Sequence, residues 1–178
     1  MIGAGDIVSF WRDAGPTKWF RGGEAFDREC DARFRDAHYA AAARTFDDWN
    51  ATPDGALALL LLLDQIPRNI FRCTAHMFAT DALARMYAVR AIDAGFDTQV
   101  DPTLRIFFYL PFEHSEDAAD QARSVALHAT LPNGDHGGWA KKHAEVIARF
   151  GRFPHRNRAL GRESTPEERD WLNAGGGF

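Results

Sequence analysis

Apolar residues recur along most of this chain at every third or fourth position, the spacing of helices that bury one face. The stripe over 7–14 predicts a short first helix, which the glycine–proline pair at 15–16 should end. Trp19 and Phe20 are then expected in a connector, before a longer helix from 24 to about 44. No segment alternates apolar and polar residues with β-branched enrichment. The pattern therefore predicts an all-α fold of about seven or eight helices with short connectors.

Capping residues and prolines mark the expected ends of the other helices. Thr52 and Pro53 should start a helix of nearly continuous leucine and alanine, which we place at the centre of the fold. Pro67 should end or kink this helix. Another helix is expected from position 101 and should be interrupted by Pro111. Further helices are expected over 80–94, 115–131, 139–150 and 165–172.

Three times an apolar helical run stops at a dense group of charged and hydrogen-bonding residues. We call these groups the first polar cluster (64–69), the second polar cluster (113–117) and the third polar cluster (151–157). Charged groups beside apolar runs are expected to be partly buried, which is costly unless they pair. We therefore expect the three clusters to meet in space, with acids facing guanidinium groups. They would form either one internal network or the lining of one pocket.

The same clusters carry a resemblance to a known family. The matching strings are LDQIPRN (63–69), YLPFEHSE (109–116) and RFGRFPHRN (149–157), continued by LGREST (160–165). Through them the chain resembles the bacterial family called domain of unknown function 924, and the likeness covers nearly its whole length. The resemblance implies a tetratricopeptide-like array of antiparallel helix pairs, or a bundle. It implies no activity, because the family carries no assigned reaction.

The first polar cluster contributes four candidate ligand-binding residues. Asp64 and Arg68 have the i,i+4 spacing of a helical ion pair, while Gln65 and Asn69 can each donate and accept hydrogen bonds. The structural alternative is a helix-end cap that satisfies the carbonyl groups freed by Pro67. The sequence favours the cap slightly.

In the second polar cluster, Glu113 and His114 are candidate catalytic residues. A histidine beside carboxylates can act as a general base or bind a metal. Adjacent residues point in different directions on a helix and the HExxH spacing is absent, so we expect no metal and no cofactor. Glu116 is a candidate ligand-binding residue, although a helix cap formed with Ser115 and Asp117 is the favoured interpretation.

The third polar cluster could bind an anion. Arg152 and Arg156 are four residues apart and could clamp a carboxylate or phosphate, with Asn157 and Arg162 as further ligand-binding candidates. His155 is the third candidate for proton transfer, and the neighbouring positive charge should keep it neutral. The alternative is that the arginines pair internally with Asp64, Glu113 or Glu116. Charge balance between the clusters favours this internal network.

Composition narrows the class of protein. With 178 residues, 46% of them hydrophobic, the chain is expected to form a single domain (1–178) with a flexible tail over 174–178. A net charge of −4 does not favour nucleic acid or an anionic membrane as a partner. The longest apolar run, 56–63, is far shorter than the roughly 20 residues of a membrane span. Cys30 and Cys73 lack CxxC spacing and we see no secretory leader, so we interpret the chain as cytoplasmic with reduced thiols.

Two functional hypotheses follow. In the first, an uncharacterised helical domain binds a peptide, a protein partner or a small ligand in grooves between its helices. In the second, an enzyme holds a small anionic metabolite with the arginines of the clusters and transfers protons through their glutamate and histidine residues. Other histidines are scattered: His38, His128, His136 and His143. The last of these lies on an apolar stripe and is expected to be a core residue. We favour the binding protein and keep the enzyme as the alternative.

Overall fold

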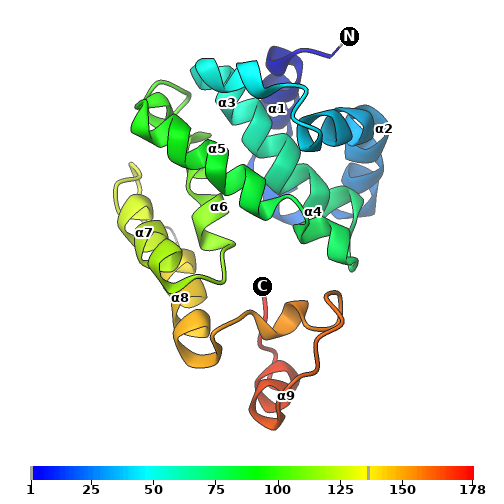
Figure 1. Cartoon of the computed structure of the whole chain (residues 1–178), viewed down its shortest axis with the longest axis vertical. Coiled ribbons are helices and arrows are strands. Elements are labelled where there is room, and N and C mark those ends of the chain that lie inside the picture. The colour runs from blue at the N-terminus through cyan, green and yellow to red at the C-terminus, as the bar shows by residue number, and fades with distance from the viewer. Residues whose placement is uncertain (1, 136) are drawn as a thin grey trace. The chain divides into compact units, whose positions relative to one another are not determined.

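The computed structural model describes residues 2–135 and 137–178, and within them the chain forms helices and no strand (Figure 1). This confirms the all-α prediction. The chain packs as two compact units: unit 1 comprises Met1–Arg72 and His76–Pro111, and unit 2 comprises Cys73–Ala75 and Phe112–Phe178. The single domain and the tetratricopeptide-like arrangement stay predictions. His136, one of the scattered histidines, lies outside the described residues.

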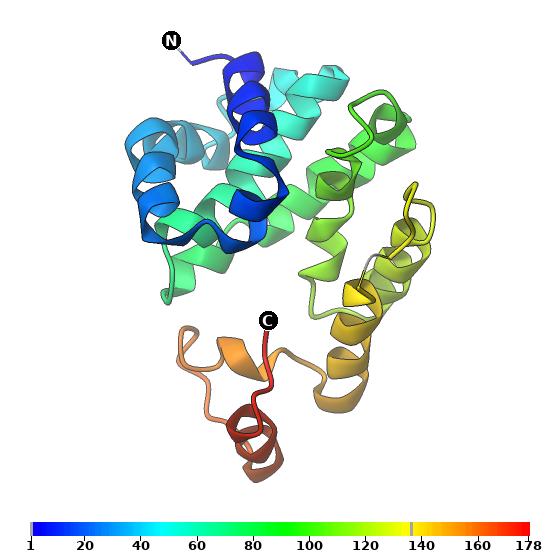
Figure 2. The same cartoon turned by 180° about the vertical axis from the view of Figure 1, so that it is seen from behind.

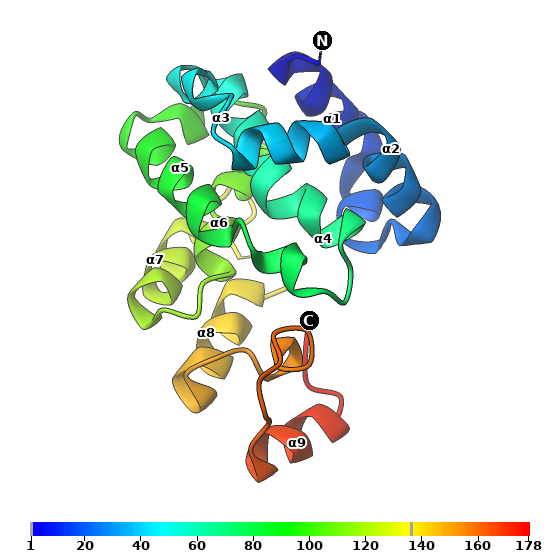
Figure 3. The same ribbon diagram turned by 45° about the vertical axis from the view of Figure 1, so that its right-hand side comes forward.

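Unit 1 is built around the leucine-rich helix, as predicted. Every side chain from 56 to 63 is at most 1% exposed, because this helix is apolar all round and has neighbours on most sides. Helix α3 packs against α1 and α5, and α2 packs against α4 (Figures 2 and 3). The helices of unit 1 are α1 (Ala4–Arg21), α2 (Gly23–Ala42), α3 (Pro53–Leu60), α4 (Ile66–Ile70) and α5 (Asp81–Asp93). The short segments are η1 (Asp47–Ala51), the π turn η2 (Leu61–Gln65), η3 (Ala75–Phe78, whose first residue belongs to unit 2), η4 (Phe96–Thr98) and η5 (Arg105–Phe108).

Helix α1 is longer than predicted, and the expected connector containing Trp19 and Phe20 is wrong. The break falls where predicted, because Gly15 takes φ 72° and ψ 172°, which is not helical. Helical structure then resumes directly and runs to Arg21. Pro16 can follow the break, since a proline costs nothing in the first turn of a helical segment. The indole Nε1 of Trp19 donates to the carbonyl oxygen of Trp11 across this kink.

Prolines start helices here more often than they end them. The chain passes from α3 through the π turn η2 into α4, and Pro67 lies in the first turn of α4. The sequence predicted that the helix ends or kinks at Pro67. In the structure the helix is instead disturbed just before this proline, by the π turn η2. The helix expected from 101 is wrong: η5 is a short 3-10 segment, and Pro111 lies inside the single-turn helix α6 (Leu110–Glu113). A first helical turn needs no N–H donor, which is why it tolerates proline.

Unit 2 contains the remaining helices, α7 (Ala118–His128), α8 (Trp139–Phe150), η6 (Pro154–Arg156) and α9 (Pro166–Asn173). Helices α7 and α8 pack side by side (Figure 1). Asp117 caps α7 by accepting from the backbone N–H groups of residues 119 and 120, which confirms this residue of the predicted cap. The hydroxyl of Ser115 accepts from the N–H of Asp117 and donates to Asp120, whereas Glu116 takes no part, so the cap is wrong for Glu116. Gly151 closes α8 with φ 68°, and Thr165 starts α9, the helix predicted from 165, with a capping box.

No helix in the described part of the chain is long and apolar enough to cross a membrane. Both cysteines are free thiols, Cys30 buried and Cys73 exposed.

Candidate functional site

The first polar cluster lies in unit 1, where acids of the same unit surround it. Arg68 donates both terminal nitrogens to Asp81 of α5, at 2.8 and 2.9 Å. Its Nη1 also lies 3.3 Å from the Oδ1 atom of Asp64, so the ion pair predicted from spacing is present. Gln65 donates to Asp64 at 2.6 Å, and Asn69 donates to a carboxylate of α2 at 2.8 Å. Arg68 is therefore committed to internal carboxylates.

The second and third polar clusters meet in unit 2. Arg162 forms a bidentate pair with Glu116, with N···O distances of 2.7 and 2.9 Å. Glu116 also accepts from the backbone N–H of Phe153 at 2.8 Å. Burial acts to raise the pKa of Glu116, but these donors outweigh it and the pKa lies below its ordinary value. Glu116 thus joins the two clusters instead of capping α7. A meeting of the first cluster with these two stays a prediction.

Glu168 is the partner of Arg152, which the sequence did not indicate. Arg152 donates to its two carboxylate oxygens at 2.6 and 2.8 Å, so the expected pairing with Asp64, Glu113 or Glu116 is wrong for this arginine. Asn157 links the two pairs: it donates to Glu168 at 3.2 Å and accepts from Arg162 at 2.9 Å. The geometry supports the internal network for these residues. Arg152 is occupied, and the buried Arg156 lies over the ring of Phe153.

A second polar group in unit 2 is buried between α7 and α8. The carboxylate of Glu113 lies 3.3 Å from Nε2 of His128 and 3.5 Å from Nδ1 of His143. All three side chains are buried, which confirms His143 as a core residue. Glu113 thus faces two imidazoles that were not among the candidates, while the candidate His114 is only half-buried. Within 2–135 and 137–178, no three side chains of His, Cys, Asp or Glu are arranged to hold a metal ion.

The buried His143 and the half-buried His155 of unit 2 are neutral at physiological pH. Burial lowers the pKa of His143 to about 3 and that of His155 to about 4. For His155 the positive charge of Arg156, which was the predicted cause, is the second contribution after burial. Neither imidazole therefore carries charge at neutral pH, and both can pack against an uncharged ring.

This neutrality can be tested directly. We expect the C2 protons of His143 and His155 to keep their neutral chemical shifts from about pH 8 down to about pH 5.5, while an ordinary histidine titrates near 6.5. NMR titration measures this, with His143→Gln and His155→Gln for assignment. Because the folded pKa values lie below the unfolded value, the unfolded chain takes up protons first and the free energy of unfolding falls as the pH drops below 6.5. A midpoint near 6.5 for either residue would contradict the burial described above.

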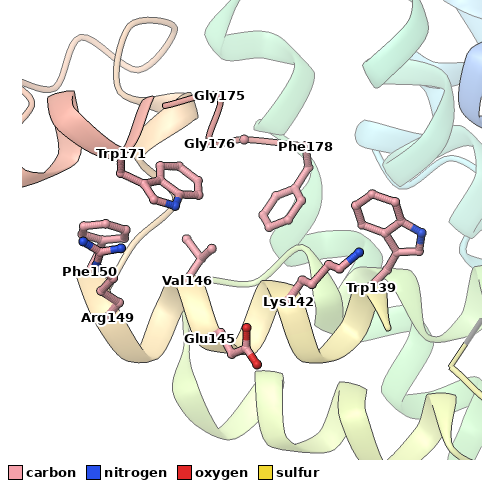
Figure 4. Close-up of a pocket in the computed structure, with 11 residues that line it drawn as sticks. Trp139, Lys142, Glu145, Val146, Arg149, Phe150, Trp171, Gly175, Gly176 and Phe178 are labelled. Atoms are coloured by element: carbon pink, nitrogen blue, oxygen red, sulfur yellow. The ribbon is translucent and has the colours of Figure 1, made fainter. Parts of the chain in front are cut away.

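An aromatic pocket lies on the surface of unit 2, between one face of α8, helix α9 and the C-terminal segment (Figure 4). Its volume is about 370 Å³. Phe150 and Trp171 lie at one end, with ring centroids 5.4 Å apart, and Trp139 and Phe178 lie at the other, 6.3 Å apart. Val146 lies between the two pairs. We call this the α8 pocket.

The sequence contained only a partial signal for the α8 pocket. In the sequence, Trp139 and Phe150 share the apolar stripe of the predicted 139–150 helix with His143, and Trp139 and Trp171 are among the aromatic residues that could be exposed. In the structure the stripe is split, since Trp139 is 48% exposed whereas Ile147 is buried. Nothing in the sequence indicated Phe178, because residues 174–178 were expected to be a flexible tail.

The comparisons with known proteins agree with this fold. A family model described as "Bacterial protein of unknown function (DUF924)" matches residues 7–176. The chain belongs to this family. A solved structure similar to it is that of the protein of unknown function ATU0120 from Agrobacterium tumefaciens, with 54% sequence identity and a TM-score of 0.92 over 96% of this chain and 97% of that one. None of the curated proteins matches the chain. Membership of the DUF924 family therefore brings a fold and no activity.

Proposed function

We propose that this member of the DUF924 family binds a small aromatic acid, meaning an organic anion with a planar ring, in the α8 pocket. The observation that carries the proposal is the pocket itself, which has two aromatic walls and an exposed lysine. Its volume of about 370 Å³ falls in the range of about 300–1,000 Å³ that is common for small-molecule sites. Pockets of this kind combine an apolar lining with a few polar groups that orient the ligand.

The aromatic walls favour a planar ligand. The two aromatic pairs stand at opposite ends of the pocket, and the short apolar side chain of Val146 leaves the space between them open (Figure 4). Aromatic pairs gain energy in offset-stacked and edge-to-face arrangements in addition to the area they bury. A flat ring between Trp171 and Trp139 could use both arrangements, whereas an aliphatic chain could use neither.

Lys142 favours an acidic ligand. Its Nζ atom lies 4.2 Å from the ring centroid of Trp139, and no carboxylate of the described residues pairs with it. The other cation of the pocket, Arg149, is occupied by Glu167 at 2.9 Å. Glu145 also borders the pocket, but its side chain points away from Phe178 (Figure 4). Lys142 is therefore the cation at the pocket that is available to a ligand carboxylate.

This proposal changes the residues that would hold an anion. The arginines expected to do so include Arg68 and Arg152, and each already has a bidentate carboxylate partner. The enzyme alternative draws its support from the buried group of Glu113, His128 and His143, which could exchange protons. Because these three side chains are buried, the exposed pocket supports the binding protein better.

Calorimetric titration with 2-naphthoate tests the proposal. We expect one equivalent to bind, with weaker binding of 2-naphthamide, which lacks the charge, and of cyclohexanecarboxylate, which lacks the aromatic ring. Lys142→Ala should weaken 2-naphthoate binding about threefold, the effect of losing one exposed ion pair. Lys141→Ala is the matched control, because Lys141 is an exposed neighbour on the same helix and does not border the pocket. Equal losses in the two variants, or no binding of any of the three compounds, would overturn the proposal.

A further inference from the structure

The aromatic ring of Phe178 occupies a box of four other rings. It is stacked on His143, with centroids 3.7 Å apart and planes 15° apart. Trp139, Phe153 and His155 present their rings nearly at right angles to it, at centroid distances of 6.3, 6.1 and 5.5 Å. One parallel and three perpendicular neighbours form a complete binding site for a planar ring, and here the chain fills it with its own side chain. We call these four residues the ring box.

The ring box suits an uncharged ring. Its two imidazoles are neutral at physiological pH, because burial lowers the pKa of both His143 and His155. A cationic group would gain little there, whereas an apolar ring gains contact with all four walls. Lys142 lies one residue before His143 and places its ammonium group over Trp139, one of the walls. A ring in the box could therefore carry an acidic substituent toward Lys142.

Phe178 is held in the box mainly by its own ring. The last backbone hydrogen bond of the described chain runs from the N–H of Gly176 to the carbonyl oxygen of Trp171, at 2.9 Å. Gly177 follows with φ 131°, a conformation that favours glycine. Phe178 remains 48% exposed although four rings surround it. Within the described residues, Gly177 and Phe178 form no hydrogen bond, and glycine makes alternative backbone conformations accessible.

The geometry points to Phe178 as an exchangeable occupant of the ring box: a ligand ring replaces it on His143, so that the C-terminal segment regulates access to the ring box, which adjoins the α8 pocket. This inference rests on the proposed function, because Phe178 lines the α8 pocket and also stacks on His143 of the ring box. The ligand class is the same aromatic acid, with its ring over His143 and its anionic group near Lys142.

An internal competitor lowers the apparent affinity by the fraction of time that it leaves the site open. If Phe178 fills the box about nine-tenths of the time, removing its ring should tighten binding about tenfold. Keeping a ring at position 178 should keep the competition. Phe178→Ala tests the first expectation, because it removes the ring. Phe178→Tyr tests the second, because it keeps a ring at position 178. Both variants leave every other residue of the pocket unchanged.

The experiment titrates 2-naphthoate into the wild type, Phe178→Ala and Phe178→Tyr, and follows the His143 ring protons by NMR. We expect about tenfold tighter binding to Phe178→Ala and an unchanged affinity for Phe178→Tyr. The His143 protons should move downfield in Phe178→Ala, because the stacked ring that shields them is gone. In the wild type they should shift as 2-naphthoate saturates the site, since one ring replaces another.

The outcomes separate this inference from the proposed function. Weaker or equal binding to Phe178→Ala, with binding to the wild type intact, would show that Phe178 is only a pocket wall and would overturn the inference alone. Wild-type binding that leaves the His143 protons unmoved would also overturn it, because the ligand ring would then lie elsewhere in the pocket. No binding to any of the three proteins would overturn both proposals.

Discussion

Replacing Arg68 with alanine is expected to lower the free energy of unfolding by about 3 kcal/mol, because it removes a guanidinium group that faces two buried carboxylates. Arg68 holds Asp81 through two hydrogen bonds and lies 3.3 Å from Asp64. Both aspartates are buried. Without the arginine, the negative charges of α5 and of the π turn η2 share one site in a medium of low polarity. Their repulsion and desolvation then act against folding.

The test is urea denaturation followed by circular dichroism. The matched control is Arg28→Ala, which removes an arginine from an exposed i,i+4 pair with Glu24. Exposed pairs of this kind contribute about 0.5 kcal/mol or less. An Arg68→Ala variant as stable as Arg28→Ala would show that the first polar cluster does not hold unit 1 together.

The second large effect is expected at Glu168, the buried carboxylate at the start of α9. It accepts from Arg152, from Asn157 and from the backbone N–H of Thr165, so it closes the capping box and anchors the third polar cluster. Glu168→Ala removes all of these bonds at once. We expect a loss of about 2 kcal/mol, the combined size of a helix cap and a charge-assisted hydrogen bond.

The pH dependence of this effect has a definite sign. The hydrogen bonds from Arg152, the largest cause, lower the pKa of Glu168 to about 2, from an ordinary value of 4.5. A carboxylate with a lowered folded pKa stabilises the protein fully above the unfolded pKa and loses that contribution as the pH falls toward the folded pKa. The difference in unfolding free energy between the wild type and Glu168→Gln should therefore be large at pH 7 and shrink between pH 4.5 and pH 2.

Denaturant titrations of the wild type and Glu168→Gln at several pH values measure this difference. Glu167→Gln is the control, because Glu167 is adjacent and exposed, and its ion pair with Arg149 lies at the surface. We expect little change for the control at any pH. A difference for Glu168→Gln that stays constant from pH 7 to pH 3 would contradict the assigned ion pair.

Charge pairing also explains where a ligand can bind. The strongest anion-binding groups in the sequence were the arginines of the polar clusters, yet Arg68, Arg152 and Arg162 are all satisfied by carboxylates of their own unit. Buried charges need partners, and an arginine that is already paired with a carboxylate of its own unit is not available to a ligand. Lys142 remains available at the α8 pocket, where it lies at the surface beside the aromatic walls.

Features that depend on neighbours in the sequence were predicted well. The run 56–63 is apolar on every side, which predicts a central helix, and all of its side chains are buried. Gly151 ends α8 and the Thr165 capping box begins α9, because caps and left-handed turns are set by local backbone chemistry. The error at Trp19 was also local: a glycine that breaks a helix does not forbid it from resuming.

The sequence by itself therefore determined the helices, their caps and the three groups of charges that had to find partners. Tertiary structure decided which partner each charge found: Arg162 meets Glu116 across 46 residues, and Arg152 meets Glu168 of a capping box. It also decided that Phe178 stacks on His143. Periodicity and capping act over a few residues and can be read along the chain. Pairings between distant residues depend on how the helices pack, which no local pattern records.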